Sequence, residues 1–384
     1  MDFSFSEEQR QLEDTLKRFA AKDYSFEARK KVLACDEGFS RAAWTGLAEI
    51  GALALNVPEA HEGMGFGPVE TLLAMNALGP ALLQEPFVAS AVIATQLLAR
   101  IDDAVTQQSL LPKLASGATI AVLAHFEPAG RYDAGWVDTR AELGNDGNGD
   151  GYVLTGHKAV VQHANAADEW LISARISGNA NDAGGVSLFR VPRGTPGVVL
   201  QSYQTLDNRR AADIQLRGVY VPATARIGTE GGALPAIEQA LDIGLAALLA
   251  EAVSLQQALV DATTEYLKTR QQFGQPIGRF QALQHRAAEM ILHLEQSRSM
   301  SYLAALRCTS SDATERRKAL SAAKVVVGQG GRFIGQNAIQ LHGGMGMTDE
   351  LQVSHWFKRL VTIESTFGDT DTHLQRFAAL ARAA

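Results

Sequence analysis

The chain is poor in cysteine and has no excess of positive charge. Only two of its 384 residues are cysteine, Cys35 and Cys308, which excludes a disulfide framework, and it contains neither a CxxC nor an HExxH motif. The nine histidines follow no metal-ligand spacing, so no metal site is expected. Its 35 basic and 42 acidic residues give a formal net charge of −7, which argues against nucleic acid as the main partner.

The sequence also lacks a secretory signal and a long uncharged apolar run. Its first residues, MDFSFSEEQRQLEDTLKRF, do not place an apolar stretch after a basic one. No window approaches about 18 apolar residues without a charge, so a membrane-spanning helix is not expected. Hydrophobic residues make up 46% and charged residues 20%, which is close to the globular average. We therefore expect a folded cytoplasmic protein with no membrane partner.

The chain has three regions with different sequence patterns, and together they predict an α+β fold with three domains. Residues 1–117 have helical periodicity, residues 118–228 hold short β-rich runs between turn residues, and residues 229–384 return to long helices. The middle runs are typical of a small barrel or sandwich, and the last part is typical of a helix bundle. This order excludes a regular βαβ array, so a nicotinamide-type Rossmann domain is disfavoured. A ligand is then expected between layers or domains.

Local signals place the ends of several elements. Ser6 and Gln9 form a capping box at the start of the first helix. The glycine-rich run at 144–151 predicts a hairpin tip, and it lacks the glutamate of a calcium-binding loop. Long helices are predicted over 235–273, 280–308 and 313–341, with shorter ones starting at 350 and 370.

The first chemical motif ends the first of these long helices. Within K-T-R-Q-Q-F-G-Q-P-I-G, Arg270 offers a planar fork suited to phosphate and Gln272 can hydrogen-bond a polar ring. Phe273 supplies a flat apolar face, and Gly274 allows a close approach of the backbone to a ligand. By spacing alone, an ordinary basic helix end with a glycine cap and a proline stop is the favoured interpretation.

Two further motifs lie downstream. In Q-L-H-G-G-M-G-M-T, Gly343, Gly344 and Gly346 can expose backbone N–H groups to an anion, although in isolation a helix–helix turn is the favoured interpretation. In T-F-G-D-T-D-T-H, Asp369 and Asp371 are suited to capping the next helix. The functional alternative is a carboxylate general base in an apolar pocket, where desolvation would raise its pKa.

Together these segments resemble the acyl-CoA dehydrogenase family over nearly the whole chain. The resemblance depends on MDFSFSEEQRQL, on K-T-R-Q-Q-F-G-Q-P-I-G-x-F-Q-A-L-Q-H and on Q-L-H-G-G-M-G-M-T, in that order. Within the family, S-A-A-K-V, H-W-F-K-R-L and F-G-D-T-D-T-H-L are similar to the small subunit of pimeloyl-CoA dehydrogenase.

The resemblance implies an N-terminal α-helical domain, a central β-barrel or sandwich domain and a C-terminal four-helix bundle, with FAD as cofactor. It implies a dimer or tetramer, either of one chain or with a related dehydrogenase subunit, and an electron-transfer flavoprotein as the electron acceptor. Carried over by motif, the residues that contact FAD from one subunit are Arg270, Gln272 and Phe273, and those that contact it from the neighbouring subunit are Gln340, Gly343 and Gly344.

The implied reaction is α,β-dehydrogenation of an acyl-CoA thioester. A base removes the α-proton, hydride leaves the β-carbon for flavin N5, and a trans-2-enoyl-CoA results. Hydrogen bonds must polarise the thioester carbonyl in a dry site, since an α-proton beside a thioester is otherwise too weakly acidic.

The catalytic base is the first place where this sequence departs from the family. The usual Tyr-Glu-Gly-Thr is replaced by Phe-Gly-Asp-Thr at 367–370. Alignment through residues 374–376 puts Asp369 at the base position, whereas alignment through Phe367 puts Gly368 there. The family's alternative base position falls on Gly244, which has no acid–base chemistry. We therefore assign Asp369, although it is one methylene shorter than glutamate and a misplacement of about 1 Å can cost about 100-fold in rate.

The β-domain and the substrate pocket depart from the family as well. The flavin segment Thr-Glu-Pro-x-x-Gly-Ser-Asp reads HFEPAGRYD here, which keeps Glu127 but introduces Arg131. The strand that normally lies against flavin reads Val-Val-Gln at 160–162, so Val161 and Gln162 are assigned to the cofactor. Substrate contacts are assigned to Arg131, Asp242 and Gly244, with Gly244 enlarging the pocket for a dicarboxylic or bulky acyl group.

Three hypotheses remain open from the sequence. The first is a catalytic FAD-dependent dehydrogenase, working with a larger relative. The second is a non-catalytic subunit that keeps the fold and completes the flavin site of its partner. The third is a flavin oxidase or monooxygenase on the same scaffold. The pair Arg209 and Arg210, in L-D-N-R-R, is either a solvated loop pair or a contact for an ω-carboxylate or for CoA phosphates.

Overall fold

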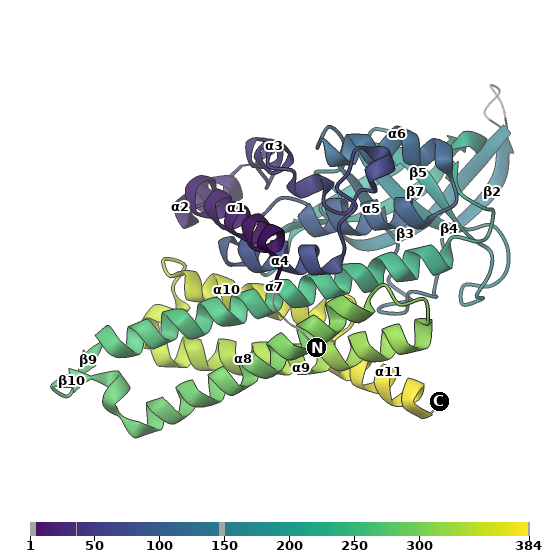
Figure 1. The fold of residues 1–384 in the computed structure, drawn as a ribbon. Coiled ribbons are helices and arrows are strands. Elements are labelled where there is room, and N and C mark those ends of the chain that lie inside the picture. Colours follow the sequence, from purple (N-terminus) through teal and green to yellow (C-terminus); the bar gives the residue numbers. More distant parts are fainter. Residues whose placement is uncertain (1–4, 36, 146–149, 383–384) are drawn as a thin grey trace. The chain divides into compact units, whose positions relative to one another are not determined.

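The computed structural model describes residues 5–35, 37–145 and 150–382, and these form two compact units (Figure 1). Unit 1 combines residues 1–30, 68–83 and 245–384, and unit 2 combines residues 31–67 and 84–244. Each unit is therefore assembled from discontinuous stretches, whereas the predicted domain boundaries after residues 117 and 228 follow changes in secondary structure along the chain.

Unit 1 is built from helices. Its first helix begins as predicted: the Ser6 side chain accepts from the Gln9 backbone, and the Gln9 side chain accepts from the Ser6 backbone. The helix α2 (Phe26–Leu33), which the sequence reasoning missed, crosses the boundary between the units. The remaining helices of unit 1 are α1 (Glu7–Asp23), α4 (Pro68–Leu78), most of α7 (Leu234–Thr269), α8 (Gln281–Arg307), α9 (Ala313–His342), α10 (Gln352–Ser365) and α11 (Thr370–Arg382).

Among the described residues five helices, α7 to α11, follow the β-rich part, one more than the four-helix bundle that the resemblance implies. Helices α8, α10 and α11 all pack against α9, which is the central helix of this part of unit 1 (Figure 1). A buried ion pair ties α7 to α10. Glu251 and Arg359 are each 1% exposed, and two hydrogen bonds of 2.7 Å join the carboxylate to the guanidinium in a bidentate pair.

The helix α7 is long and apolar enough to cross a membrane by length and composition alone. However, 89% of its most apolar window is buried inside the structure. Burial of this kind is typical of the central helix of a large core, where apolar residues surround the whole helix. The helix also contains acidic residues such as Glu251, which is paired with Arg359.

Unit 2 contains one mixed eight-stranded sheet. Its strands run in the order β6-β7-β3-β2-β4-β5-β8, and β1 pairs with β4 in parallel. The hairpin between β2 and β3 is confirmed by the pairing of Gly144 with Gly151, while residues 146–149 of its predicted tip lie outside the described part. The strands are β1 (Ala121–Ala124), β2 (Arg140–Asn145), β3 (Asp150–Gln162), β4 (Glu169–Arg175), β5 (Val186–Pro192), β6 (Val198–Gln204), β7 (Arg210–Pro222) and β8 (Arg226–Ile227).

Short helices complete unit 2, namely α3 (Arg41–Glu49), a π-helical segment (Phe87–Ala94), α5 (Thr95–Arg100) and α6 (Ala104–Ala115). The π-helical segment packs against β1. Its residues are mostly buried, and such segments in helices are frequent at functional sites.

Candidate functional site

The first predicted cofactor segment forms a small hairpin directly after α7. The helix ends at Thr269 rather than at residue 273, because the two-residue strands β9 (Gln271–Gln272) and β10 (Gln275–Pro276) pair there. Phe273 at the turn has φ of 53°, a left-handed conformation that is costly for a bulky residue, and its side chain is 90% exposed. Arg270 and Gln272 are also exposed. An aromatic side chain held in this way is available to a ligand or to another chain.

The second predicted segment is a turn at the C-terminal end of α9. Gly343 has φ of 60°, and a Cβ atom added to Gly343 or Gly344 would meet nothing within 4 Å, so the space over both is open. Gln340, in the last turn of α9, is exposed. One expectation needs correction: the N–H of Gly343 is not offered to an anion, because it donates to the backbone oxygen of Gln340 and so caps the helix.

These two segments lie next to each other within one chain. Tyr266 in the last turn of α7 stacks on His342, the last residue of α9, with 4.5 Å between the ring centroids and 28° between the ring planes. Tyr266 precedes Arg270 by four residues and His342 directly precedes Gly343. Each protomer therefore presents both segments side by side, and the assignment of the two segments to FAD from neighbouring subunits stays a prediction.

In unit 2, Glu127 is part of a buried polar cluster. It is 5% exposed, and its carboxylate accepts from Lys158 Nζ at 2.6 Å and from the backbone nitrogens of Asp138 and Thr139 at 2.7 and 3.0 Å. Burial would raise the pKa of Glu127, but the Lys158 ammonium and these hydrogen bonds hold it below its usual value. Burial lowers the pKa of Lys158 to about 8. The hydrogen bonds of this carboxylate therefore lie within the interior of unit 2. Its contact with flavin stays a prediction.

The ion pair of Glu127 and Lys158 joins the two segments of unit 2 that were assigned to flavin. The backbone supports the same link, since Ala159 N donates to Phe126 O at 2.8 Å. Between Lys158 and Val161 the β3–β7 register shifts, and Val160 at this bulge has φ of 52° and is 57% exposed.

This bulge changes which residues of β3 are available to a ligand. Val161, which was assigned to the cofactor, is 4% exposed, whereas Gln162 is half-buried. The exposed residue is Val160, which lies at the bulge and was not assigned to the cofactor. Arg131 is exposed and has a left-handed φ of 48°. Its role with the substrate stays a prediction.

The loop before α11 carries the assigned base. Asp369 is half-buried, and its Oδ1 accepts from the backbone nitrogen of Thr372 at 2.8 Å, so this aspartate caps α11. Hydrogen bonds from the Thr372 side chain and backbone hold the pKa of Asp369 below its usual value. The expectation of a pKa raised by desolvation is therefore wrong. The carboxylate of Asp369 is therefore ionised at neutral pH, and its role as the catalytic base stays a prediction.

Two buried side chains make hydrogen bonds to the backbone of this loop and of the helix end before it. Lys324 in α9 is 1% exposed, and its Nζ donates to the backbone oxygens of Ile363 and Thr366 at 2.5 and 2.9 Å. His373 is fully buried, with Nε2 3.1 Å from Phe367 O and Nδ1 3.2 Å from Ser321 Oγ. Since a carbonyl only accepts, Nε2 carries the proton and donates to Phe367, and Nδ1 accepts from Ser321. Burial lowers the pKa of His373 to about 3, so it stays neutral.

Gly368 cannot be replaced without strain in this loop. Its φ is 114°, and a Cβ atom would lie 2.9 Å from His373 Nε2. The alternative alignment, which places the base position at residue 368, therefore falls on a position that this fold reserves for glycine. Sequence reasoning gave Lys324 no role in this loop, because a lone lysine on a helix is usually a surface residue.

The remaining assigned residues belong to unit 2. Asp242 is half-buried and Gly244 is buried, both on α7. Arg209 lies 3.9 Å from Asp207, and the side chain of Arg210 packs over Gly38, where an added Cβ would be 2.4 Å from Arg210 Cγ. Arg210 is therefore partly committed to packing within unit 2. Substrate contacts by Asp242 and Gly244 stay a prediction.

Family models cover nearly the whole chain. They are described as the N-terminal, middle and C-terminal domains of acyl-CoA dehydrogenase, and they match residues 6–118, 123–219 and 231–381. A relative from Pseudomonas fluorescens, an L-prolyl-[peptidyl-carrier protein] dehydrogenase, is 30% identical over 366 residues, which span 92% of each chain.

Two solved structures are similar over almost their full length. The ChsE4–ChsE5 complex from Mycobacterium tuberculosis matches with a TM-score of 0.88 and 25% identity over 100% of both chains. A structure described as an FAD-dependent dehydrogenase matches with a TM-score of 0.85 and 26% identity over 99% of both chains.

Proposed function

The chain belongs to the acyl-CoA dehydrogenase family, and we propose that it converts an acyl-CoA thioester of a dicarboxylic or bulky acid into the trans-2-enoyl-CoA. As a member of this family it is an FAD-dependent oxidoreductase. The observation that carries the proposal is the stack of Tyr266 on His342, because it places the exposed Phe273 hairpin beside the open Gly343–Gly344 turn.

This pair of surfaces fits the cofactor. Phe273 offers a flat apolar face, the neighbouring Arg270 offers a guanidinium suited to phosphate, and the open space over the two glycines admits a bulky group without a side chain to displace. When bound, FAD supplies the chemistry of hydride acceptance from the β-carbon. We propose that Arg270, Gln272 and Phe273 of one subunit bind and orient it together with Gln340, Gly343 and Gly344 of the neighbouring subunit.

In this proposal Asp369 takes the α-proton of the thioester. Its lowered pKa keeps the carboxylate ready to accept a proton across the neutral range, although a weak base gives little driving force for the transfer. Lys324 and His373 hold the loop that carries Asp369, so the carboxylate is fixed in one place before substrate binds.

The substrate class and the partners follow from the resemblance to the pimeloyl-CoA dehydrogenase small subunit. We propose a heteromer with a larger related dehydrogenase, in line with the similarity to the two-protein ChsE4–ChsE5 complex. The exposed guanidinium of Arg131 and the lack of a side chain at Gly244 are suited to an ω-carboxylate and a wide acyl group. An electron-transfer flavoprotein is the proposed electron acceptor.

A second candidate is a subunit that completes the flavin site of its partner without catalysing the reaction. One observation favours it: Asp369 is engaged as a helix cap with a lowered pKa, and the two other positions that can carry the base in the family are Gly244 and Gly368.

The experiment is anaerobic reduction of the bound flavin. The chain is purified alone and after co-expression with a larger related dehydrogenase subunit, and each sample is mixed with pimeloyl-CoA, octanoyl-CoA and a bulky acyl-CoA. Bleaching of the flavin absorbance that is lost in Asp369→Asn supports the first function. Bleaching of the complex that survives this substitution supports the second. Rapid peroxide formation in air without another acceptor favours an oxidase.

A further inference from the structure

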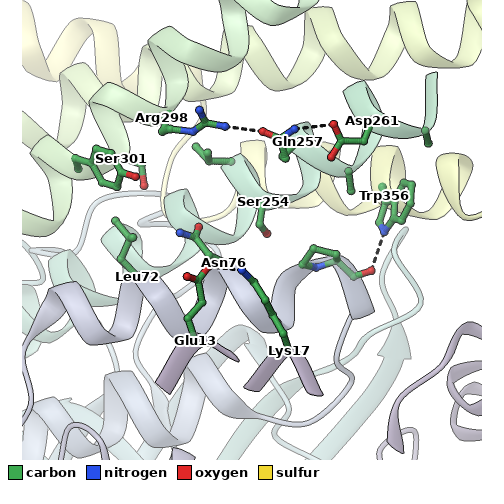
Figure 2. Close-up of a pocket in the computed structure, with 15 residues that line it drawn as sticks. Glu13, Lys17, Leu72, Asn76, Ser254, Gln257, Asp261, Arg298, Ser301 and Trp356 are labelled. Carbon is green, nitrogen blue, oxygen red and sulfur yellow. Dashed lines mark hydrogen bonds and ion pairs between the residues drawn. The ribbon is translucent and has the colours of Figure 1, made fainter. Parts of the chain in front are cut away.

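Unit 1 contains a pocket of about 580 Å³, and none of the residues that line it is assigned to FAD or to the thioester (Figure 2). Helices α1, α4, α7, α8 and α10 all contribute to its walls, and all the lining residues belong to unit 1. The volume is within the range of pockets that hold small molecules, about 300–1,000 Å³. None of the described residues that line it takes part in the chemistry proposed above.

The space arises from small side chains on α7. Ser254, Ala258 and Ala262 follow each other at intervals of four residues, so they share one face of the helix and line the pocket together. Leu72 of α4 and Trp356 of α10 add apolar surface. Trp356 is held in place, because its indole Nε1–H donates to Pro80 O at 2.8 Å (Figure 2).

The charged groups around the pocket already have hydrogen-bond partners within the chain. On α1, Lys17 Nζ lies 2.9 Å from Glu13 Oε1. Across the pocket, Arg298 donates to Gln257 Oε1, and Gln257 in turn donates to Asp261 Oδ1 at 2.8 Å, as the dashed lines in Figure 2 show. A charged ligand would have to displace one of these hydrogen bonds or lie unpaired against the apolar wall, where burial of its charge costs free energy.

One polar group of the lining has no such partner. Ser301 of α8 is 2% exposed, and within the described residues its Oγ makes no hydrogen bond. Buried hydroxyls are almost always hydrogen-bonded, because leaving one unpaired forfeits its interaction with water. Ser301 thus supplies a donor and an acceptor for a group that enters the pocket.

We propose that this pocket binds a small uncharged molecule with an apolar body and one hydroxyl or carbonyl oxygen, which pairs with the Ser301 hydroxyl. The apolar body lies against the small residues of α7 and the fixed ring of Trp356. The site is separate from the flavin site, so the proposal does not depend on the reaction.

Three probes of the same skeleton and different charge test it by calorimetric titration of the full-length protein: phenylpropanol, phenylpropionate and phenylpropylamine. Phenylpropanol binds saturably at one site per chain, and each charged analogue binds at least about 10-fold more weakly, since it leaves a buried charge without a free partner. Ser301→Ala weakens phenylpropanol binding about 3- to 10-fold, the range of one net hydrogen bond.

Two further variants locate the binding. Ala258→Phe fills the pocket and abolishes binding of phenylpropanol, whereas Ala379→Phe, on the exposed surface of α11, leaves it unchanged. Phenylpropanol also changes the tryptophan emission of the wild type, and this change is lost in Trp356→Phe, which keeps the proposal testable if Ala258→Phe fails to fold. Equal binding of all three probes, phenylpropanol binding that Ser301→Ala leaves intact, an emission change that persists in Trp356→Phe, or binding only at non-saturating high concentration would overturn the proposal.

Discussion

Lys324 of α9 and Thr366 of the loop before α11 are joined by a hydrogen bond of 2.9 Å from Nζ to the backbone oxygen. The same ammonium also donates to Ile363 O at the end of α10. A single buried lysine therefore ties together the end of one helix and the loop that carries Asp369. Its burial lowers its pKa to about 7, which makes the stability of the loop dependent on pH.

The free energy of unfolding is expected to respond to pH through Lys324. In the unfolded chain this lysine has a pKa near 10.5, whereas in the folded chain the value is about 7. Between these values the unfolded state binds more protons, so unfolding becomes less favourable as the pH rises. Urea titrations from pH 7 to pH 10 should show stability increasing in the wild type relative to Lys324→Met. Lys268→Met, at an exposed lysine, serves as the control and should follow the wild type.

Asp369 has two separable roles, and two substitutions separate them. Asparagine caps a helix about as well as aspartate, so Asp369→Asn should keep the stability of the wild type while flavin reduction by acyl-CoA falls steeply. Asp369→Ala should lose the same activity and also about 0.5–2 kcal/mol of stability. The measurements are stopped-flow flavin reduction and chemical denaturation of each variant. Activity that is unchanged in Asp369→Asn would remove this residue from the mechanism.

The pH profile of the reaction follows from the same carboxylate. Because the pKa of Asp369 lies below its usual value, the base of the free enzyme stays ionised above pH 5. A plot of kcat/KM against pH should therefore show no acidic limb from this group between pH 5 and pH 8. An acidic limb near pH 6 that disappears in Asp369→Asn would contradict this expectation.

Gly368 should tolerate no side chain. Gly368→Ala combines a left-handed φ of 114° with a Cβ atom 2.9 Å from His373, so we expect a loss of about 1–3 kcal/mol. Two control substitutions separate the backbone strain from the steric clash. At Gly194, φ is 86° and nothing lies within 4 Å of an added Cβ, so Gly194→Ala measures the strain alone. At Gly184 the space is also open and φ is not left-handed, so Gly184→Ala has neither effect. Thermal denaturation should rank Gly184→Ala as least and Gly368→Ala as most destabilising.

The ion pair between Glu251 and Arg359 predicts a strong asymmetry between single and double substitutions. Arg359→Met leaves a buried carboxylate without its partner and should cost about 3–5 kcal/mol. Replacing both residues, as in Glu251→Leu with Arg359→Met, should recover most of that loss, since no buried charge remains. If the double variant is no more stable than the single one, the pair contributes through packing rather than through its charges.

Local signals in the sequence predicted most of the helices and strands. The Ser6–Gln9 capping box and the pairing of Gly144 with Gly151 are confirmed, because both depend on residues that are close along the chain. The end of α7 was placed four residues too late, since Gln271 and Gln272 suit a helix by composition and only their pairing with β10 shows otherwise.

The contents of the candidate site were harder to predict. Val160 is exposed because of a bulge in β3, and a bulge leaves no signal in alternating hydrophobicity. Lys324 and His373 are buried by helices that are distant in sequence from the loop they hold, so their roles appear only when α9 and α11 are packed together. The Tyr266–His342 stack joins residues 76 positions apart in the sequence, so no local pattern predicts it.

The central claim, that this chain uses FAD to oxidise an acyl-CoA, is tested most directly by the visible spectrum during anaerobic addition of pimeloyl-CoA. The purified protein, with its related subunit where one is required, is compared with the Asp369→Asn form of the same preparation. Our account predicts flavin absorbance that bleaches on mixing in the wild type and persists in the variant. A preparation that carries FAD but is bleached equally in both forms, or by no acyl-CoA thioester, would contradict it.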